Sequence, residues 1–315
     1  MPTMRIGSCS IAFALLVVNG AYGEDYPVRP VRIVTSEAGG GSDFVARLVA
    51  QGLSLSLGQP VIVDNRVGSI APEAVLRATP DGYTVLVSGS TFWLAPLLRK
   101  TSYDPVKDFA PISMLSDSPN ILVVHPSVPA TTVKELIVLA RARPKGLNYA
   151  GTTGASSHLA AELFKSMAGI DMVYVPYKGT GPALNDLLGG QVQVMFAVTA
   201  SVMPHVKSGR LRAVAATGAK PSALVPDLPI VAATLPGFEV GTPYEMFAPS
   251  RVPAAIIKRL NREVVQLLDQ PAIKGKFFSA GGEAAGGSPE QLAAKLRSDI
   301  DLWGKVVRNA ALREY

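Results

Sequence analysis

The chain has 315 residues, of which 48% are hydrophobic and 17% charged, and its 30 basic and 24 acidic residues give a net charge of +6. This length fits two domains of average size. The charges are scattered, without the basic stripe and interleaved aromatic residues of a nucleic-acid groove, so we expect no nucleic-acid partner. We find no run of roughly 20 apolar residues that could cross a bilayer.

The first 23 residues are expected to form a signal peptide. A positive start (residues 1–5), an apolar run (11–18) and small residues at 21–23 are the three parts of a secretory signal. Cleavage after Gly23 would leave 29 basic and 24 acidic residues, a net charge of +5. It would also remove the one cysteine, Cys9, which lies in a segment resembling a lipoprotein cleavage box. A mature chain without cysteine excludes disulfide-stapled secreted proteins, and we expect a periplasmic protein.

From residue 31 onward, short β-branched segments alternate with helical ones. The expected strands are 31–34, 61–63, 84–87, 121–124, 148–150, 173–175, 192–196, 211–215 and 244–248. The expected helices are 45–57, 132–143, 158–168, 182–188, 253–268 and 289–311. Two helix starts carry their own signals, a Thr132 to Glu135 capping box and Pro289 after Ser288. This alternation predicts the α/β class with mostly parallel sheets.

Two loops are suited to binding an anion, because each follows a strand and opens a helix. Backbone N–H groups at such a helix start can hold a carboxylate or phosphate without a basic side chain. The first loop contributes Ser36, Glu37, Gly39, Gly40, Gly41, Ser42 and Asp43. The second contributes Thr152, Thr153, Ser156 and His158. An ordinary strand-to-helix turn would explain the first loop equally well, and helix capping alone would explain Ser156 and Ser157 of the second. Two such loops in two halves of the chain favour a ligand cleft between domains.

Histidine offers few routes to catalysis, since the chain has only His125, His158 and His205. His158 and Glu162 are four residues apart, but no third metal ligand is near in sequence. The nucleophile elbow and the phosphate-binding loop motifs are both missing. One enzymatic alternative remains, a periplasmic hydrolase that uses Ser156 or Ser157 with His158. We expect a protein that is not an enzyme and needs no metal or cofactor.

Short motifs in a fixed order resemble the Bug family, the substrate-binding components of tripartite tricarboxylate transporters. The motifs include Tyr26-Pro27, Gly39-Gly40 with Ser42-Asp43, Gly58-Gln59-Pro60-Val61, Pro80-Asp81-Gly82-Tyr83-Thr84, Tyr103-Asp104-Pro105, Asp108-Phe109, His158-Leu159, Val175-Pro176-Tyr177-Lys178-Gly179, Gly209-Arg210-Leu211-Arg212-Ala213 and Pro226-Asp227. The resemblance covers nearly the whole mature chain. It implies a two-domain periplasmic-binding-protein fold of type II that closes on a small carboxylate, held by the two loops partly through ordered water.

The resemblance also guides the remaining predictions. We expect residues 24–124 plus 245–315 to form domain 1 and residues 125–244 to form domain 2. Ser90, Thr91, Tyr177 and Gly179 join the candidate ligand-binding residues. The expected partners are a small organic acid and inner-membrane transporter subunits or, alternatively, a sensor kinase, and we expect a monomer.

Glu37 departs from the family pattern, because a carboxylate in this loop would repel an anionic ligand. It could face solvent, pair with an arginine such as Arg47 or Arg66, or meet an amine on the ligand. Of the two tryptophans, Trp93 is expected near the cleft, because it follows the carboxyl end of a strand. Trp303, in the last helix, is expected to be remote.

Overall fold

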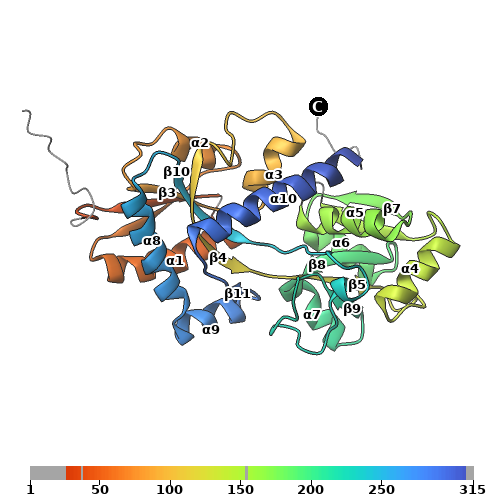
Figure 1. Ribbon diagram of the computed structural model, residues 1–315. Helices are drawn as coiled ribbons and strands as arrows, with labels where there is room; N and C mark the ends of the chain where they lie inside the picture. The colour runs from red at the N-terminus through yellow and green to blue at the C-terminus, as the bar shows by residue number, and fades with distance from the viewer. Residues whose placement is uncertain (1–25, 37, 153–154, 310–315) are drawn as a thin grey trace, which may run out of the picture.

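The computed structural model describes residues 26–36, 38–152 and 155–309, which form two lobes, each built on its own β-sheet (Figure 1). The sheet of lobe 1 has the strand order β11-β4-β10-β3-β1-β2, and that of lobe 2 has the order β7-β6-β8-β5-β9. The strands of lobe 1 are β1 (Val31–Thr35), β2 (Val61–Asn65), β3 (Thr84–Gly89), β4 (Phe109–Asp117), β10 (Tyr244–Pro249) and β11 (Glu283–Ala284). Those of lobe 2 are β5 (Asn120–Val124), β6 (Asn148–Thr152), β7 (Val173–Tyr177), β8 (Val194–Val198) and β9 (Arg212–Ala216).

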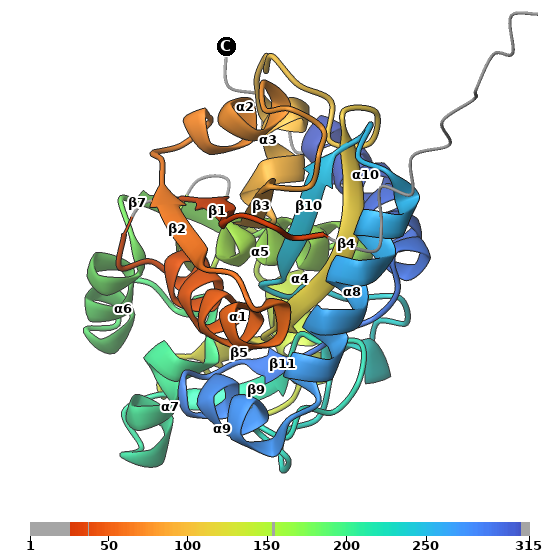
Figure 2. The same ribbon diagram turned by 90° about the vertical axis from the view of Figure 1, so that its left-hand side faces the viewer.

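Helices cover both sheets, and the apolar face of each helix sets its position. In lobe 1 they are α1 (Gly41–Leu57), α2 (Ile70–Leu76), α3 (Thr91–Leu98), α8 (Ala254–Leu268) and α9 (Pro271–Ser279). In lobe 2 they are α4 (Val133–Ala142), α5 (Ser156–Ala168), α6 (Thr180–Leu188) and α7 (Thr199–Lys207), with a short 3-10 helix, η1 (Val231–Ala233). The last helix, α10 (Pro289–Asn309), packs on α3 and β4 of lobe 1 and reaches α5 of lobe 2. Figure 1 shows it running from lobe 1 toward lobe 2, and Figure 2 shows the same arrangement with lobe 1 facing the viewer.

Both sheets are mixed, whereas the sequence pattern predicted mostly parallel ones. β1 pairs in parallel with β2 and β3, but β10 is antiparallel to β3 and β4. In lobe 2, β6 is parallel to β7 and β8, and β5 is antiparallel to β8 and β9. The antiparallel strands are those next to the crossings between lobes. β5 is the first strand after the chain enters lobe 2, and β10 is the first strand after it returns to lobe 1. Neither follows a helical crossover of the kind that produces parallel neighbours.

The two passages between the lobes lie side by side. Thr242 donates its backbone N–H to the carbonyl of Ser118 at 2.8 Å, and Pro119 and Gly241 form an isolated bridge. The whole of β5 belongs to the sheet of lobe 2. The first passage therefore lies a few residues before the expected crossing within residues 121–124.

The nine expected strands and the helical segments are confirmed, with shifts of a few residues at their ends. Both predicted helix starts are also confirmed. Thr132 and Glu135 form a reciprocal capping box, and the Ser288 hydroxyl accepts the backbone N–H of Gln291 at 3.2 Å. Strand β4 was missed because Pro111 interrupts its pattern. Pro111 cannot donate a ladder hydrogen bond, but β11 pairs with β4 only at residues 116–117. The pairing of β4 with β10 also shifts register next to Pro111, so the proline is tolerated.

Among the described residues, none of the helices combines the length and apolar composition that crossing a membrane requires. The signal peptide predicted for residues 1–23, with Cys9, lies outside the described residues, as do Glu37, Thr153 and the expected last turn of α10 at 310–311.

Candidate functional site

A cavity of about 470 Å³ opens between the lobes and is lined chiefly by hydroxyl-bearing residues and glycines. It brings together seven of the predicted ligand-binding residues: Ser36, Gly40, Gly41, Ser42, Ser90, Thr91 and Ser156. Sequence reasoning missed other lining residues, notably Ser69, Ser88, Arg99, Tyr103, Thr242 and Tyr244. Arg99 is the one charged side chain among the described residues that line the cavity.

Three helices begin at this cavity, and their first turns determine its electrostatics. The residues preceding them are Gly40 for α1, Ser90 for α3 and Ala155 for α5, and all three line the cavity. No described side chain caps any of these three starts. Uncapped backbone N–H groups at the positive end of a helix dipole are strong donors to an anion. The cavity is therefore suited to a negatively charged ligand.

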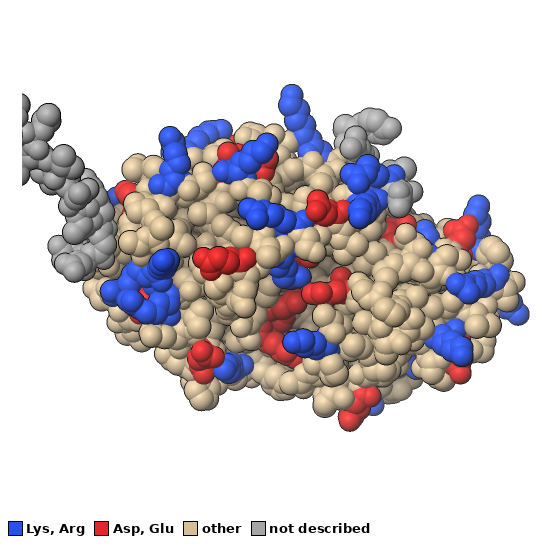
Figure 3. All heavy atoms as spheres, in the orientation of Figure 1, with Lys and Arg blue, Asp and Glu red and all other residues tan. Residues whose placement is uncertain are grey.

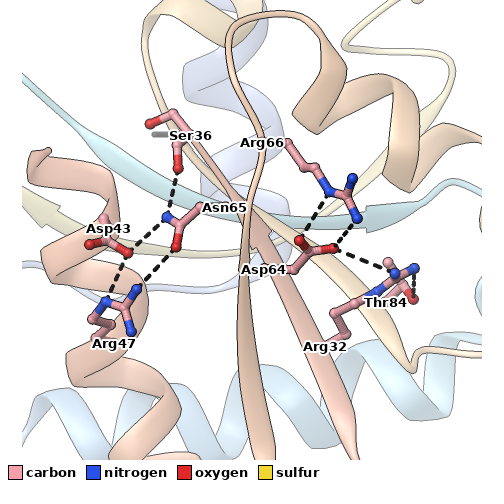
Figure 4. Close-up of polar contacts among 8 residues, drawn as sticks. All are labelled: Arg32, Ser36, Asp43, Arg47, Asp64, Asn65, Arg66 and Thr84. Carbon is pink, nitrogen blue, oxygen red and sulfur yellow. Dashed lines mark hydrogen bonds and ion pairs between the residues drawn. The ribbon is translucent and has the colours of Figure 1, made fainter. Parts of the chain in front are cut away.

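Asp43 holds the first loop in shape. Its carboxylate accepts the Gly39 backbone N–H at 2.9 Å, pairs with Arg47 Nε at 2.9 Å and accepts Asn65 Nδ2 at 2.8 Å. Asn65 also donates to the carbonyl of Ser36 at 2.8 Å, so that β2 and α1 both hold the loop (Figure 4). Burial raises the pKa of the Asp43 carboxyl, but the hydrogen bonds from Arg47, Gly39 and Asn65 outweigh burial and hold that pKa below its ordinary value. Asp43 and Gly39, both predicted to bind ligand, are not among the residues that line the cavity.

A second charged group lies on the opposite face of β2. Figure 4 shows Asp64 between Arg66 and Arg32, pointing away from the Asp43 and Asn65 group. Arg66 Nε lies 3.0 Å from Asp64 Oδ1, and Arg32 lies 3.5 Å from Oδ2. Arg47 and Arg66, considered as partners of Glu37, are thus engaged by Asp43 and Asp64 respectively. Glu37 itself lies outside the described residues.

The Tyr244 side chain forms the floor beneath the start of α1. Its hydroxyl lies against Gly41 so closely that a Cβ atom on residue 41 would force the tyrosine or the helix start to shift. The close approach therefore favours glycine at position 41, and the tyrosine brings a further hydroxyl to the cavity wall.

The second loop reaches the cavity through Ala155 and Ser156. The Ala155 N–H donates to the carbonyl of Thr152 at 2.9 Å, which closes the turn from β6 into α5. Ser156 Oγ lies 3.3 Å from the hydroxyl of Thr242. Thr152 ends β6 without lining the cavity, and Thr153 lies outside the described residues.

His158 is a core residue of lobe 2. It is 1% exposed and stacks on Tyr174, with ring centroids 4.1 Å apart. Burial lowers the pKa of His158, which favours the neutral ring. Its suggested metal partner Glu162 is engaged by Lys165 at 2.9 Å and by the Tyr149 hydroxyl. Because the imidazole lies in this aromatic stack while Ser156 lines the cavity, the geometry does not favour a serine hydrolase.

Tyr177 and Gly179 lie apart from the cavity wall. The Tyr177 hydroxyl donates to Asp186 at 2.6 Å, and burial together with this bond raises the pKa of Tyr177 to about 12. Gly179 precedes α6 in extended backbone.

The two tryptophans lie together, which corrects the expectation that Trp303 is remote. Both line a small cavity of about 20 Å³ beside the larger one. The cause is the position of α10, which packs along α3. Trp93 itself is 2% exposed and faces this smaller cavity.

Two lobes joined by paired crossing segments, with helix starts from both lobes facing one cavity, define a periplasmic-binding-protein architecture. The chain belongs to the tripartite tricarboxylate transporter family of receptors, whose family model matches residues 45–312. It is 34% identical to protein BugT of Bordetella pertussis over 92% of both chains, and 36% identical to a UPF0065 protein of Bordetella bronchiseptica over 95% of this chain and 90% of the relative.

Solved structures agree with this assignment. The chain is 36% identical to a Rhodopseudomonas palustris protein, Rpa4515, solved with adipate (TM-score 0.73), and covers 99% of it with 91% of its own length. It is 32% identical to MatC from the same organism, solved with bound malate (TM-score 0.70, covering 90% of this chain and all of MatC). A further neighbour is the periplasmic binding protein BugD (33% identical, TM-score 0.71, covering 92% of this chain and all of BugD).

Proposed function

We propose that the protein is a periplasmic solute-binding receptor that captures a small carboxylate-bearing organic acid or amino acid for a tripartite tricarboxylate-type transporter. The observation that carries this proposal is the convergence of three uncapped helix starts on one hydroxyl-lined cavity. A carboxylate placed there would replace the water that otherwise satisfies these N–H groups. Arg99 adds a positive charge farther along the wall.

The ligand class has support from two relatives, since the solved neighbours hold adipate and malate. We propose that the ligand carboxylate contacts the starts of α1, α3 and α5, with Ser36, Ser42, Ser90, Thr91 and Ser156 as hydroxyl partners. Asp43 and Gly39 would act through loop shape rather than direct contact.

Domain closure follows from this placement. We propose that the lobes move as domains, with limits close to residues 24–124 plus 245–315 and residues 125–244. Sheet membership favours Ser118 to Pro119 as the first hinge segment. A ligand that contacts α1 and α5 together would favour the closed arrangement.

The proposal is tested by titration calorimetry with adipate and malate, and with 1,6-diaminohexane as a control of similar length and opposite charge. Binding of one site per chain by an acid, without turnover and without binding of the diamine, is the expected result. Diamine binding without acid binding would reject the proposal. A protein that passes its ligand signal to a sensor kinase would give the same titration. Identifying the membrane protein that binds this chain, a transporter subunit or a sensor kinase, would distinguish the two roles.

Glu37 decides between organic acids and amino acids. If its carboxylate meets an amine, glutamate should bind more tightly than glutarate, and Glu37→Gln should weaken glutamate binding by about 1.5–3 kcal/mol. An unchanged affinity for both ligands would place the Glu37 side chain in solvent.

A further inference from the structure

A buried carboxyl group in the returning strand holds the first turn of α3. Trp93 Nε1 donates to Glu245 Oε2 at 3.1 Å, and both side chains are buried, with exposed fractions of 2% and 0%. The second oxygen, Glu245 Oε1, has no hydrogen-bond partner within the described part of the chain. A fully buried carboxyl with one satisfied oxygen is costly, so its retention in a core strand calls for a role beyond packing.

The groups around Glu245 come from several elements and are mostly acidic. Helix α10 contributes Asp299 and Lys295, and β4 contributes Asp117, whereas β3 has no titratable residue. Lys295 is shared between Glu239 at 3.1 Å and Asp299 at 3.3 Å, so its charge is largely neutralised. Figure 3 shows acidic side chains gathered near the middle of this face, where the lobes meet, with basic ones beside them.

This group adjoins the ligand cavity. Trp93, Asp117, Lys295 and Asp299 line the small cavity of about 20 Å³, and Ser90 and Ser156 line both cavities. Ser90 precedes α3, and Trp93 lies on its first turn. The bond that holds the indole of Trp93 therefore anchors one of the three helix starts proposed to hold the ligand.

We propose that Glu245 is a positioning residue for the anion site, which holds Trp93 and thereby fixes the first turn of α3 against the strand by which the chain returns to lobe 1. This inference rests on the proposed function, because the site that Glu245 positions is the proposed carboxylate site. The occupant of that site is an anion, and an ionised Glu245 beside it would repel the anion.

Proton linkage follows from this arrangement. Burial, reinforced by the charge of Asp299, raises the pKa of Glu245 to about 8, so the side chain is neutral below that pH. An anion bound at the start of α3 must raise this pKa further, since linkage between two sites is reciprocal. Binding near pH 8 should therefore take up a proton at Glu245.

The first experiment measures adipate binding by calorimetry at pH 6.5, 8 and 9. Wild-type affinity is expected to fall about tenfold between pH 6.5 and 9. Glu245→Gln should bind adipate with an affinity that varies less than twofold over this range. Titrations at pH 8 in buffers of different ionisation enthalpy should reveal proton uptake by the wild type and none by Glu245→Gln.

Trp93→Phe is the second variant, because it removes the indole N–H and leaves the carboxyl in place. The Trp93 bond lowers the pKa of Glu245, so its loss should move the pH dependence to higher pH. If Trp93 only filled space, its replacement by Phe would not move the pH dependence of adipate binding to higher pH. Wild-type affinity with an unchanged pH profile in both variants would overturn the inference.

The second experiment needs no ligand and separates this inference from the proposed function. Trp303→Phe leaves Trp93 as the sole tryptophan of the chain. Its emission should change with a midpoint near pH 8, and Asp299→Asn should lower that midpoint because a like charge is removed. Adding Glu245→Gln should abolish the change. Emission that does not vary with pH would reject the coupling of Glu245 to Trp93. Failure of every acid to bind wild type, with the pH-dependent emission intact, would instead reject the proposed function and leave that coupling standing.

Discussion

The Tyr244 hydroxyl packs directly on the backbone of Gly41, at the first residue of α1. The contact joins the strand that returns from lobe 2 to the loop that follows β1, two segments separated by about 200 residues of chain. The loop proposed to bind the ligand is thus supported from beneath by a side chain of the returning strand, and the geometry of one depends on the other.

Gly41→Ala is therefore expected to weaken ligand binding at least tenfold. The new Cβ atom would overlap the Tyr244 ring and displace either the tyrosine or the start of α1. Calorimetry with adipate measures the loss. Gly275→Ala is the matched control, because Gly275 lies in α9 with open space around it, and alanine should stabilise that helix by about 0.5–1 kcal/mol. Equal adipate affinity in the two variants would contradict the role given to Gly41.

Arg99→Gln should reduce the affinity for adipate about fivefold, with a smaller effect on a monocarboxylate such as hexanoate. The guanidinium lines the cavity but is exposed, so solvent screening limits its contribution to about 1 kcal/mol. Lys100→Gln makes the same change of charge next to it and should alter the affinity less than twofold. If both variants lose affinity equally, the effect comes from the overall field rather than from contact.

Stability should fall as pH rises from 5.5 to 8. The folded protein keeps a proton on Glu245 up to a pKa of about 8, whereas the unfolded chain releases it near 4.5. Each pH unit in this interval removes about 1.4 kcal/mol, or roughly 3 kcal/mol in all. Urea unfolding measures the change. Glu245→Gln should abolish the decline above pH 6.5, and burial of Asp117, whose pKa is raised to about 6, should add a decline below that pH. A wild-type stability that does not vary with pH above 6.5 would exclude a neutral Glu245.

Asp43→Asn is expected to destabilise the protein by about 1–2 kcal/mol at pH 7 and to weaken adipate binding without contacting the ligand. The amide keeps the shape of the side chain but loses the charge that holds Arg47 and the Gly39 N–H. The pKa of Asp43 is held low, so its contribution is present at neutral pH and is lost as pH falls through that lowered value. The stabilities of the variant and the wild type should therefore converge in acid. A constant difference down to pH 3 would show that the effect is steric.

The sequence predicted the elements better than the sheets they form. Strand and helix patterns are local, and the capping box at Thr132 was readable from four residues. Each sheet combines parallel and antiparallel pairs because the chain crosses between the lobes, and a local sequence pattern does not show where it crosses. The loop glycines and serines that line the cavity were predictable because a strand followed by glycines and a helix is a local signal.

Other parts of the site depend on long-range packing. Arg99, Thr242 and Tyr244 come from segments that carried no motif of their own, and Trp303 is brought to Trp93 only by the way α10 packs on α3. His158 and Tyr177 were predicted to bind ligand because of their chemistry and their family position. In the structure His158 stacks on Tyr174, and Tyr177 donates a hydrogen bond to Asp186. These side chains are held away from the cavity by packing, which a short stretch of sequence does not reveal.

The position of β10 between β3 and β4 has a consequence for the order in which the protein folds. Until residues 244–249 are present, the sheet of lobe 1 is divided into β1, β2 and β3 on one side and β4 on the other. Lobe 2 takes all its strands from residues 120–216, so it can complete its sheet from one continuous stretch. Lobe 1 must wait for pairings that span more than 100 residues, which are slow to form. The contact of Tyr244 with Gly41 therefore forms late, and the cavity that Tyr244 lines is complete only once the C-terminal quarter of the chain is present.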